Sequence, residues 1–349
     1  METVFIRELR PFLDAVAEQM ELYVPKKAEE HFVYVRYDPA SGVPVEFNNI
    51  RVCATAKEFL FPMCELAAVF PERAEPEEIK PFAVFGLKDC DLRSIAILDK
   101  VFAEEEFKDP LYLKRRENMF IISSDCFEPG PNCFCNLFGG QPFAEGRFDL
   151  NVSKTEGGFI IEAGSDRGRD FIDKHSDLFT RASEAVLAQR NEARAKTQQQ
   201  LDQNNAEYKF DVPIKEIVEN SQDSEVFDIE AKGCVECQGC TRICPTCHCF
   251  YLYDTKQKDY FSKMKMWDSC MRTAYAEVAG GANPRRVLGD RVKHRLLHKF
   301  VYFLDRYGID MCVGCGRCMD TCAGQVDTRA VLKKLNEELK DKKEAKVAK

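Results

Sequence analysis

The stretch that decides the fold runs from 234 to 322 and contains one cysteine pattern twice. The first copy is CVECQGCTRIC (234–244), followed by Pro245, and the second is CVGCGRCMDTC (312–322). Both copies read CxxCxxCxxxC. Three thiolates at three-residue intervals can wrap a tight turn around one 4Fe-4S cluster, whereas the fourth cysteine ligates the other cluster when two motifs are present. The sequence therefore predicts two 4Fe-4S clusters with crossed ligands.

The crossed pairing assigns the last cysteine of each motif to the cluster of the other motif. Cluster 1 is predicted on Cys234, Cys237, Cys240 and Cys322. Cluster 2 is predicted on Cys312, Cys315, Cys318 and Cys244. Glycines suit such turns, because the backbone passes close to sulfide and can need a positive φ; they are Gly233, Gly239, Gly314 and Gly316.

Zinc and disulfide bonds are the alternative uses of these cysteines. A zinc site takes four ligands in total, as two cysteine pairs separated by a long gap or as a Cys/His mixture. Here each run supplies four cysteines alone, and a second run repeats it. Disulfide frameworks belong to small secreted domains, whereas this chain is long and shows no leader at its start. The spacing favours iron–sulfur clusters.

Length and composition set the general class of the protein. A chain of 349 residues is too long for one ordinary core, so we expect two domains with connecting structure. A net charge of −8 argues against a nucleic-acid surface. No apolar run approaches the ~20 residues of a membrane span. With 17 cysteines in a chain read as cytoplasmic, most are expected to be ligands.

Two predicted strands in the N-terminal half each end in an Asp-Cys pair. They are residues 82–87 before Asp89-Cys90 and 119–122 before Asp125-Cys126, with a helix predicted over 91–102 between them. A βαβ unit makes its strands parallel, so both pairs should emerge at the carboxyl edge of the sheet, where ligand sites of α/β sheets lie.

Four cysteines can meet at that edge, because a loop carries two more shortly after the second strand. They are Cys90, Cys126, Cys133 and Cys135. We predict a third 4Fe-4S cluster on them; the alternative is that they are ordinary loop and core thiols. The flanking aspartates should depress the potential of an anionic cluster unless Lys88 or Arg93 compensates.

Five cysteines lie outside these sets. Cys53 and Cys64 stand in apolar surroundings without ligand spacing, so buried structural thiols are expected. Cys247, Cys249 and Cys270 exceed what two clusters need. They are either thiols that donate weak hydrogen bonds to ligand sulfurs, which tunes potential, or ligands of a further group.

The predicted fold class is a multidomain α+β protein, with a mixed sheet in its N-terminal domain and two clusters in an α-helical ferredoxin domain. A hairpin over 148–163 should close the first domain. The predicted parts are an α/β domain (1–165), a polar helical bridge (166–232), the ferredoxin domain (233–330) and a charged tail (331–349). No chemical role is predicted for the bridge.

An ordered set of motifs resembles a known family over roughly residues 80–325. The motifs are GLKDCD (86–91), SSDCFEPGPNCFCNL (123–137), CVECQGCTRICPTCHC (234–249), MWDSC (266–270), VAGG (278–281) and MCVGCGRCMDTC (311–322). They resemble the β-type iron–sulfur subunit of cytoplasmic sulfhydrogenases, which also occurs in anaerobic sulfite reductases and is similar to a flavin oxidoreductase partner of heterodisulfide reductase. One departure is Ala323, where the family usually has proline.

The resemblance implies a non-catalytic electron carrier. It would pass electrons between a flavoprotein that binds NAD(P)H and a terminal reductase or hydrogenase, both being subunits of one complex. The chain shows neither a dinucleotide fingerprint nor a Walker sequence of its own. One alternative is a self-contained oxidoreductase with a catalytic cluster in the N-terminal domain. A cluster-bearing regulatory or scaffold protein is another, but no effector or nucleic-acid module is recognisable.

Overall fold

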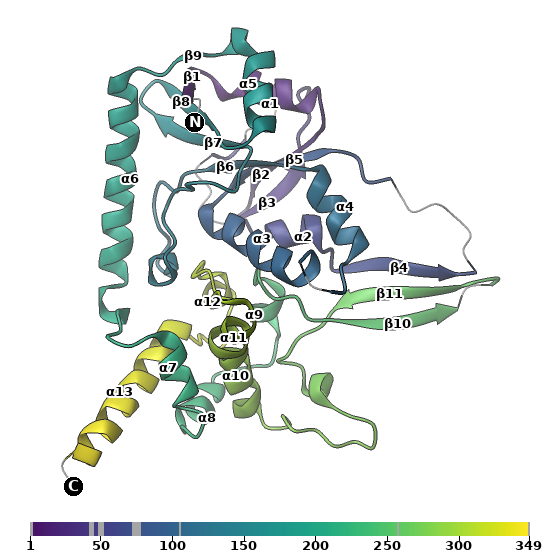
Figure 1. Ribbon diagram of the computed structural model, residues 1–349, viewed down its shortest axis with the longest axis vertical. Helices are drawn as coiled ribbons and strands as arrows, with labels where there is room; N and C mark the ends of the chain where they lie inside the picture. Colours follow the sequence, from purple (N-terminus) through teal and green to yellow (C-terminus); the bar gives the residue numbers. More distant parts are fainter. Residues whose placement is uncertain are drawn as a thin grey trace. The chain divides into compact units, whose positions relative to one another are not determined.

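The computed structural model describes residues 3–41, 45–47, 52–71, 78–104, 106–256 and 258–347 (Figure 1). Contacts within the chain divide it into two compact units. The first unit consists of residues 1–61 and 74–204, and the second of residues 62–73 and 205–349. Each unit is described by itself.

The first unit is built on a mixed sheet. Within the described residues it has eight strands in the order β3-β2-β5-β6-β7-β8-β1-β9. The pairs β2/β5, β5/β6 and β6/β7 are parallel and the outer pairs antiparallel. The bounds are β1 Thr3–Ile6, β2 Glu21–Ala28, β3 His31–Arg36, β5 Phe82–Leu87, β6 Met119–Ser124, β7 Leu150–Thr155, β8 Gly158–Ala163 and β9 Thr180–Arg181. The predicted mixed sheet, parallel strand pair and hairpin are confirmed.

Helices cover this sheet because its central strands are apolar on both faces. Every residue of β5 and β6 is buried. On one face, Phe85 and Phe120 join a core with Phe12 of α1 (Leu9–Ala17) and Phe171 of α5 (Asp166–Lys174). The rings of Phe12 and Phe171 meet edge to face at 5.7 Å. Alternating apolar side chains thus supply a core on each face.

Helix α3 (Asp89–Phe102) connects β5 to β6 and buries apolar side chains that include Leu92 and Ile95. It begins two residues before the predicted start, with Lys88 as its N-cap. Asp91 therefore caps from inside the first turn, where its carboxylate accepts the backbone N–H of Lys88 at 3.0 Å. The other helices of this unit are α2 Ala56–Leu60, α4 Pro110–Asn118 and α6 Glu184–Asn204.

The second unit combines short helices with a three-stranded antiparallel sheet in the order β10-β11-β4. Its strands are β4 Cys64–Phe70, β10 Phe250–Lys256 and β11 Phe261–Trp267. Its helices are α7 Ile214–Glu219, α8 Val226–Ala231, α9 Gly239–Arg242, α10 Leu288–Leu297, α11 Phe303–Tyr307, α12 Arg317–Asp320 and α13 Thr328–Val347. A π-helical turn, His298–Tyr302, joins α10 to α11.

Two expectations about these regions are wrong. The ferredoxin domain, predicted to be α-helical, is not made of helices alone, because a β-hairpin occupies 250–267. Cys53 and Cys64 are exposed rather than buried. Their apolar neighbours suggested burial, but most residues of β4, where Cys64 lies, are exposed.

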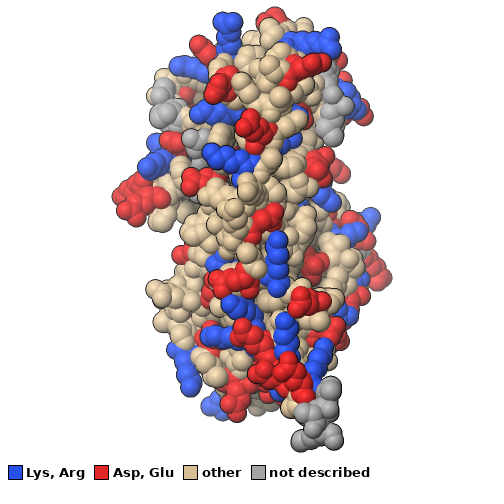
Figure 2. All heavy atoms as spheres, turned by 90° about the vertical axis from the view of Figure 1, so that its left-hand side faces the viewer, with Lys and Arg blue, Asp and Glu red and all other residues tan. Residues whose placement is uncertain are grey.

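Helix α13 carries Lys and Glu at many positions and is tied to neighbouring segments of its own unit. Lys333 pairs with Glu207 at 2.7 Å, and Lys343 pairs with Glu216 at 3.2 Å. Val331, Leu332 and Leu335 of this helix are buried. Figure 2 shows basic and acidic side chains interspersed over the face that it displays. Such mixed charge solvates a helix without creating a strong field of one sign.

Candidate metal centres

The two cysteine motifs form the same turn, although their sequences differ. Gly314 and Gly316 have positive φ angles of 64° and 76°. The equivalent positions of the first motif are Glu236 and Gln238, with φ of 56° and 63°. Non-glycine residues rarely adopt this region, so its repetition shows that the cysteine spacing imposes the turn.

The end of the second motif packs against the start of the first. A side chain on Gly324 would clash with the carbonyl oxygen of Gly233 and would lie 3.2 Å from Cα of Cys234. Only glycine allows this close approach of two backbones. Residue 322 is therefore brought to the first motif, as the crossed pairing requires.

The thiols that lie near individual cysteines indicate the same crossed arrangement. Burial raises the pKa of Cys240, and the nearby thiols of Cys318, Cys234 and Cys322 raise it further. Burial raises the pKa of Cys315 to about 11, with contributions from Cys244 and Cys318. The last cysteine of each motif thus lies among the thiols of the other.

Cys312 of the second motif also has Cys244, the last cysteine of the first motif, among its neighbours. Burial raises the pKa of Cys312 to about 12, and Cys318 and Cys244 add to this.

Among the described residues, no three His, Cys, Asp or Glu side chains are close enough to bind one metal ion together. Cluster ligands need not meet that condition, because four irons and four sulfides lie between the thiolates. A donor set of four thiols suits the soft irons of such a cluster.

Cys244 has an unusually polar environment for a buried thiol. Lys299 Nζ donates to its Sγ at 3.4 Å, and the hydroxyl of Thr246 lies 3.2 Å from the same sulfur. A hydrogen bond from Cys247 lowers the pKa of Cys244, and Lys299 lowers it further. On the other motif, the backbone N–H of Val326 donates to Cys322 Sγ at 3.3 Å. These donors stabilise negative charge on the ligand sulfurs.

The three additional cysteines of this unit gather around a small cavity. Cys247, Cys249 and Cys270 line it, together with Arg295 and Lys299. Cys247 is the donor to Cys244, which suits a thiol that tunes a ligand. The Tyr275 hydroxyl donates to Cys249 at 3.5 Å. For Cys249 and Cys270, hydrogen bonding and ligation both remain open predictions.

In the first unit, three of the four cysteines predicted to bind a third cluster are close neighbours. Burial raises the pKa of Cys126 to about 12, and the adjacent Cys133 raises it further. The pKa of Cys135 is raised by burial and then by Cys126 and Cys133. Cys90 lies in the first turn of α3, where it interacts with Lys88. Lys88, at the carboxyl end of β5, thus has both Cys126 and Cys90 near it, and ligation of a third cluster by all four cysteines stays a prediction.

Two cationic side chains lie at the carboxyl edge of the first sheet, and sequence analysis did not identify one of them. Lys88, 1% exposed, donates to Ser124 Oγ at 2.8 Å and to the carbonyl oxygen of Asp125 at 3.1 Å. Arg194 of α6 contacts the Asp125 carboxylate at 2.7 Å and Glu162 at 2.8 Å. It lies in the bridge segment, for which no chemical role was expected. Arg190 and Arg194, spaced i and i+4, were the available sign that one face of α6 meets acidic groups.

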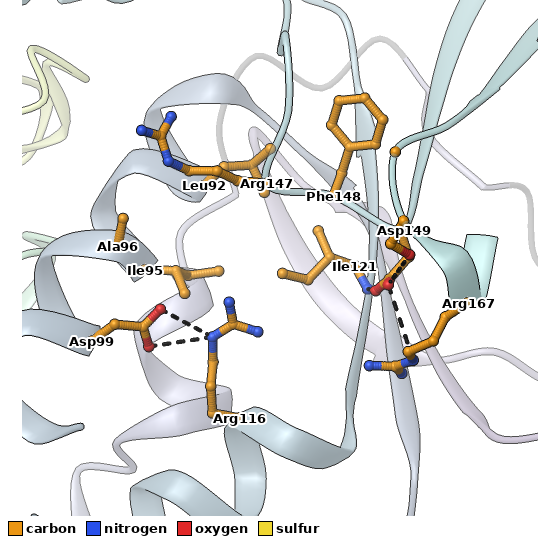
Figure 3. Close-up of a pocket in the computed structure, with 12 residues that line it drawn as sticks. Leu92, Ile95, Ala96, Asp99, Arg116, Ile121, Arg147, Phe148, Asp149 and Arg167 are labelled. Atoms are coloured by element: carbon orange, nitrogen blue, oxygen red, sulfur yellow. Dashed lines mark hydrogen bonds and ion pairs between the residues drawn. The ribbon is translucent and has the colours of Figure 1, made fainter. Parts of the chain in front are cut away.

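A separate pocket of about 380 Å³ lies elsewhere in the first unit, near the starts of β6 and β7 (Figure 3). Arg116 contacts Asp99 at 3.2 Å, and Arg167 lies 4.0 Å from Asp149. Ligand sites of α/β sheets lie at the opposite, carboxyl edge, where the cysteines are. The pocket therefore takes no part in the thiol site.

Comparison with known proteins defines the class. Residues 233–326 match a family described as a 4Fe-4S dicluster domain. The second unit thus contains a ferredoxin-type 4Fe-4S domain. The chain is 34% identical over 333 residues to sulfhydrogenase 2 subunit beta of Pyrococcus furiosus, covering 94% of this chain and 96% of the relative. The chain belongs to the sulfhydrogenase β-subunit family and is an iron–sulfur electron-transfer protein.

In the part of the chain that the structure describes, no helix has the length and apolar character needed to cross a bilayer.

Proposed function

We propose that the chain relays single electrons through two crossed 4Fe-4S clusters in its second unit and a third cluster in its first. The observation that supports this most strongly is the exchange of sulfur neighbours between the motifs. Cys244 lies with Cys312 and Cys315, and Cys322 lies near Cys240. Crossed ligands are the arrangement of two-cluster ferredoxins. Two clusters that share ligand segments are close enough for electrons to pass between them.

The relative from Pyrococcus furiosus indicates which kind of partner subunits this chain has. That protein is named as the beta subunit of a sulfhydrogenase. We propose that this chain likewise works in a cytoplasmic complex, between a flavoprotein subunit that binds NAD(P)H and a terminal subunit. The terminal subunit is a hydrogenase, a sulfite reductase or a heterodisulfide reductase, and purification of the native complex with identification of its subunits would decide which.

The relay role predicts that the isolated chain does not oxidise NADPH. Dithionite should bleach its iron–sulfur absorbance under anaerobic conditions, whereas NADPH should act only after the flavoprotein partner is added. The reason is that hydride donors need a flavin to split two electrons into single steps. The competing hypothesis, a self-contained oxidoreductase, predicts the reverse. Rapid bleaching of the isolated chain by NADPH would reject the relay.

The third cluster is tested by counting iron and acid-labile sulfide in the full chain. With three clusters, the anaerobically reconstituted protein should hold about twelve irons and twelve sulfides. Cys133→Ser and Cys135→Ser should each lower both counts by about four. Cys53→Ser is the matched control, because Cys53 is exposed and outside the set. A parent with about eight irons, unchanged by Cys133→Ser, would show that these cysteines are structural.

A further inference from the structure

Two buried cations of the second unit have no acidic partner. Lys299 is 4% exposed and Arg295 is 9% exposed. Within the described residues, no Asp or Glu contributes to the electrostatic surroundings of either side chain, and Nε of Arg295 has no hydrogen-bond partner. A buried charge is costly unless another charge or a hydrogen bond compensates it. Both cations therefore need an anionic neighbour.

The neighbours that the structure supplies are sulfur atoms. Lys299 Nζ donates to Cys244 Sγ at 3.4 Å and to the hydroxyl of Thr246 at 3.2 Å. The charge of Lys299 also acts on Cys312. In the crossed assignment, Cys244 and Cys312 are both ligands of cluster 2. Lys299 is thus directed at a single cluster.

Arg295 lines the same small cavity as Lys299, together with Cys247, Cys249 and Cys270. Its charge acts on Cys240 and Cys318, and also on Cys247 and Cys244, which lie near Lys299 as well. Arg295 lies on α10 and Lys299 in the π-helical turn that follows, four positions later. Residues at i and i+4 share one face of a helix, so this face presents two cations to the thiols.

We propose that Lys299 sets the reduction potential of cluster 2. The inference rests on the proposed function, because it uses the crossed ligands. Reduction adds one electron from a one-electron donor and converts [4Fe-4S]²⁺ to [4Fe-4S]⁺, while every Cys–Fe bond is kept. The added negative charge lies in a poorly solvated interior. A fixed cation beside the ligand sulfur stabilises the reduced state and raises the potential.

The experiment is a mediated redox titration of the full, reconstituted chain, followed by electron paramagnetic resonance. Signals are assigned with Cys315→Ala, which removes cluster 2, and Cys237→Ala, which removes cluster 1. Lys299→Met should make reduction of cluster 2 at least ~10-fold less favourable, a drop of about 59 mV for a one-electron couple. Cluster 1 should shift less.

Matched variants separate charge from packing. Lys299→Arg keeps the charge and should restore most of the potential. Lys343→Met removes a lysine that is 63% exposed and should shift neither cluster. If Lys299→Met loads iron poorly, Lys299→Gln keeps a polar side chain at the same site and should show the same drop. Unchanged potentials in an iron-replete Lys299→Met or Lys299→Gln protein would overturn the proposal.

Failure of the proposed function would be visible separately. If the motifs do not cross, Lys299 would still contact Cys244, but its effect would fall on the cluster that Cys237→Ala removes. A shift on that cluster would reject the crossed assignment and keep the role of Lys299 as a potential-setting residue. A shift on neither cluster would reject the role of Lys299 and leave the assignment standing.

Discussion

The two units place buried cations beside cysteines in different ways. In the first unit, Arg194 is paired with Asp125 and Glu162, and Lys88 bonds to oxygen atoms at the end of β6. In the second unit, Lys299 and Arg295 face sulfur. Carboxylates are charged with or without a metal, whereas buried thiols are anionic only when a metal or a cation holds them so. The charge of Arg194 is balanced by carboxylates of the protein, whereas Lys299 and Arg295 depend on thiolates that the clusters hold.

The largest expected effect comes from removing iron. Anaerobic chelation should unfold the second unit, because it leaves buried cations without thiolates and removes the metal from a unit of short helices. The first unit should persist, since it keeps its sheet core and its carboxylate pairs. Limited proteolysis with mass spectrometry should find early cuts in 205–347 and late cuts in the strands of the first sheet. Equal resistance of both units to proteolysis after iron removal would contradict the difference between them.

A smaller change is expected from removing a single ligand. Cys315→Ala should lower the iron count by about four and abolish one paramagnetic signal, because a cluster that loses a ligand becomes labile. Hydrogen exchange of β5 and β6 should be unchanged. Cys64→Ala, at an exposed cysteine on β4, is the control. An unchanged spin count would reject the assignment of Cys315 to a cluster.

Next in size is an effect confined to the first unit. Arg194→Met leaves the Asp125 carboxylate buried without its cation, whereas Glu162 keeps Arg190 at 2.8 Å, so the unit should be destabilised by about 3 kcal/mol. Arg169→Met is the control, since Arg169 pairs with Asp166 on the surface and should cost less than ~1 kcal/mol. Hydrogen exchange of β6 measures both. The clusters of the second unit should keep their paramagnetic signals. A loss of those signals with unchanged hydrogen exchange of β6 would contradict a stabilising role of Arg194 in the first unit.

The sequence predicted the ligand spacing better than the surroundings of the ligands. Cysteine intervals and strand ends act locally, so the repeated turn and the clustering of Cys126, Cys133 and Cys135 could be expected from them. Lys299 and Arg194 lie tens of residues from the groups they contact, and nothing in their local sequence distinguishes them from solvated cations. The β-hairpin between the motifs was missed because its strand β11 pairs with β4, nearly two hundred residues earlier, and local propensity does not encode that pairing.

The smallest expected effect concerns the turn that the two motifs share. Gln238 adopts φ of 63°, where its counterpart in the second motif is Gly316 at 76°. Gln238→Gly should stabilise the second unit by up to ~1 kcal/mol, because glycine enters this region without a steric penalty. Gly316→Gln should cost a similar ~1 kcal/mol.

Thermal denaturation of the cluster-loaded protein, followed by iron–sulfur absorbance, measures the two changes. Glu236, also at positive φ, is unsuitable for this test because its carboxylate pairs with Arg291 at 2.7 Å. The two substitutions should move the midpoint in opposite directions, since each gives one motif the residue of the other. If both substitutions lower the midpoint of thermal denaturation equally, the two turns do not bear the same backbone strain. The two motifs would then share only their cysteine spacing.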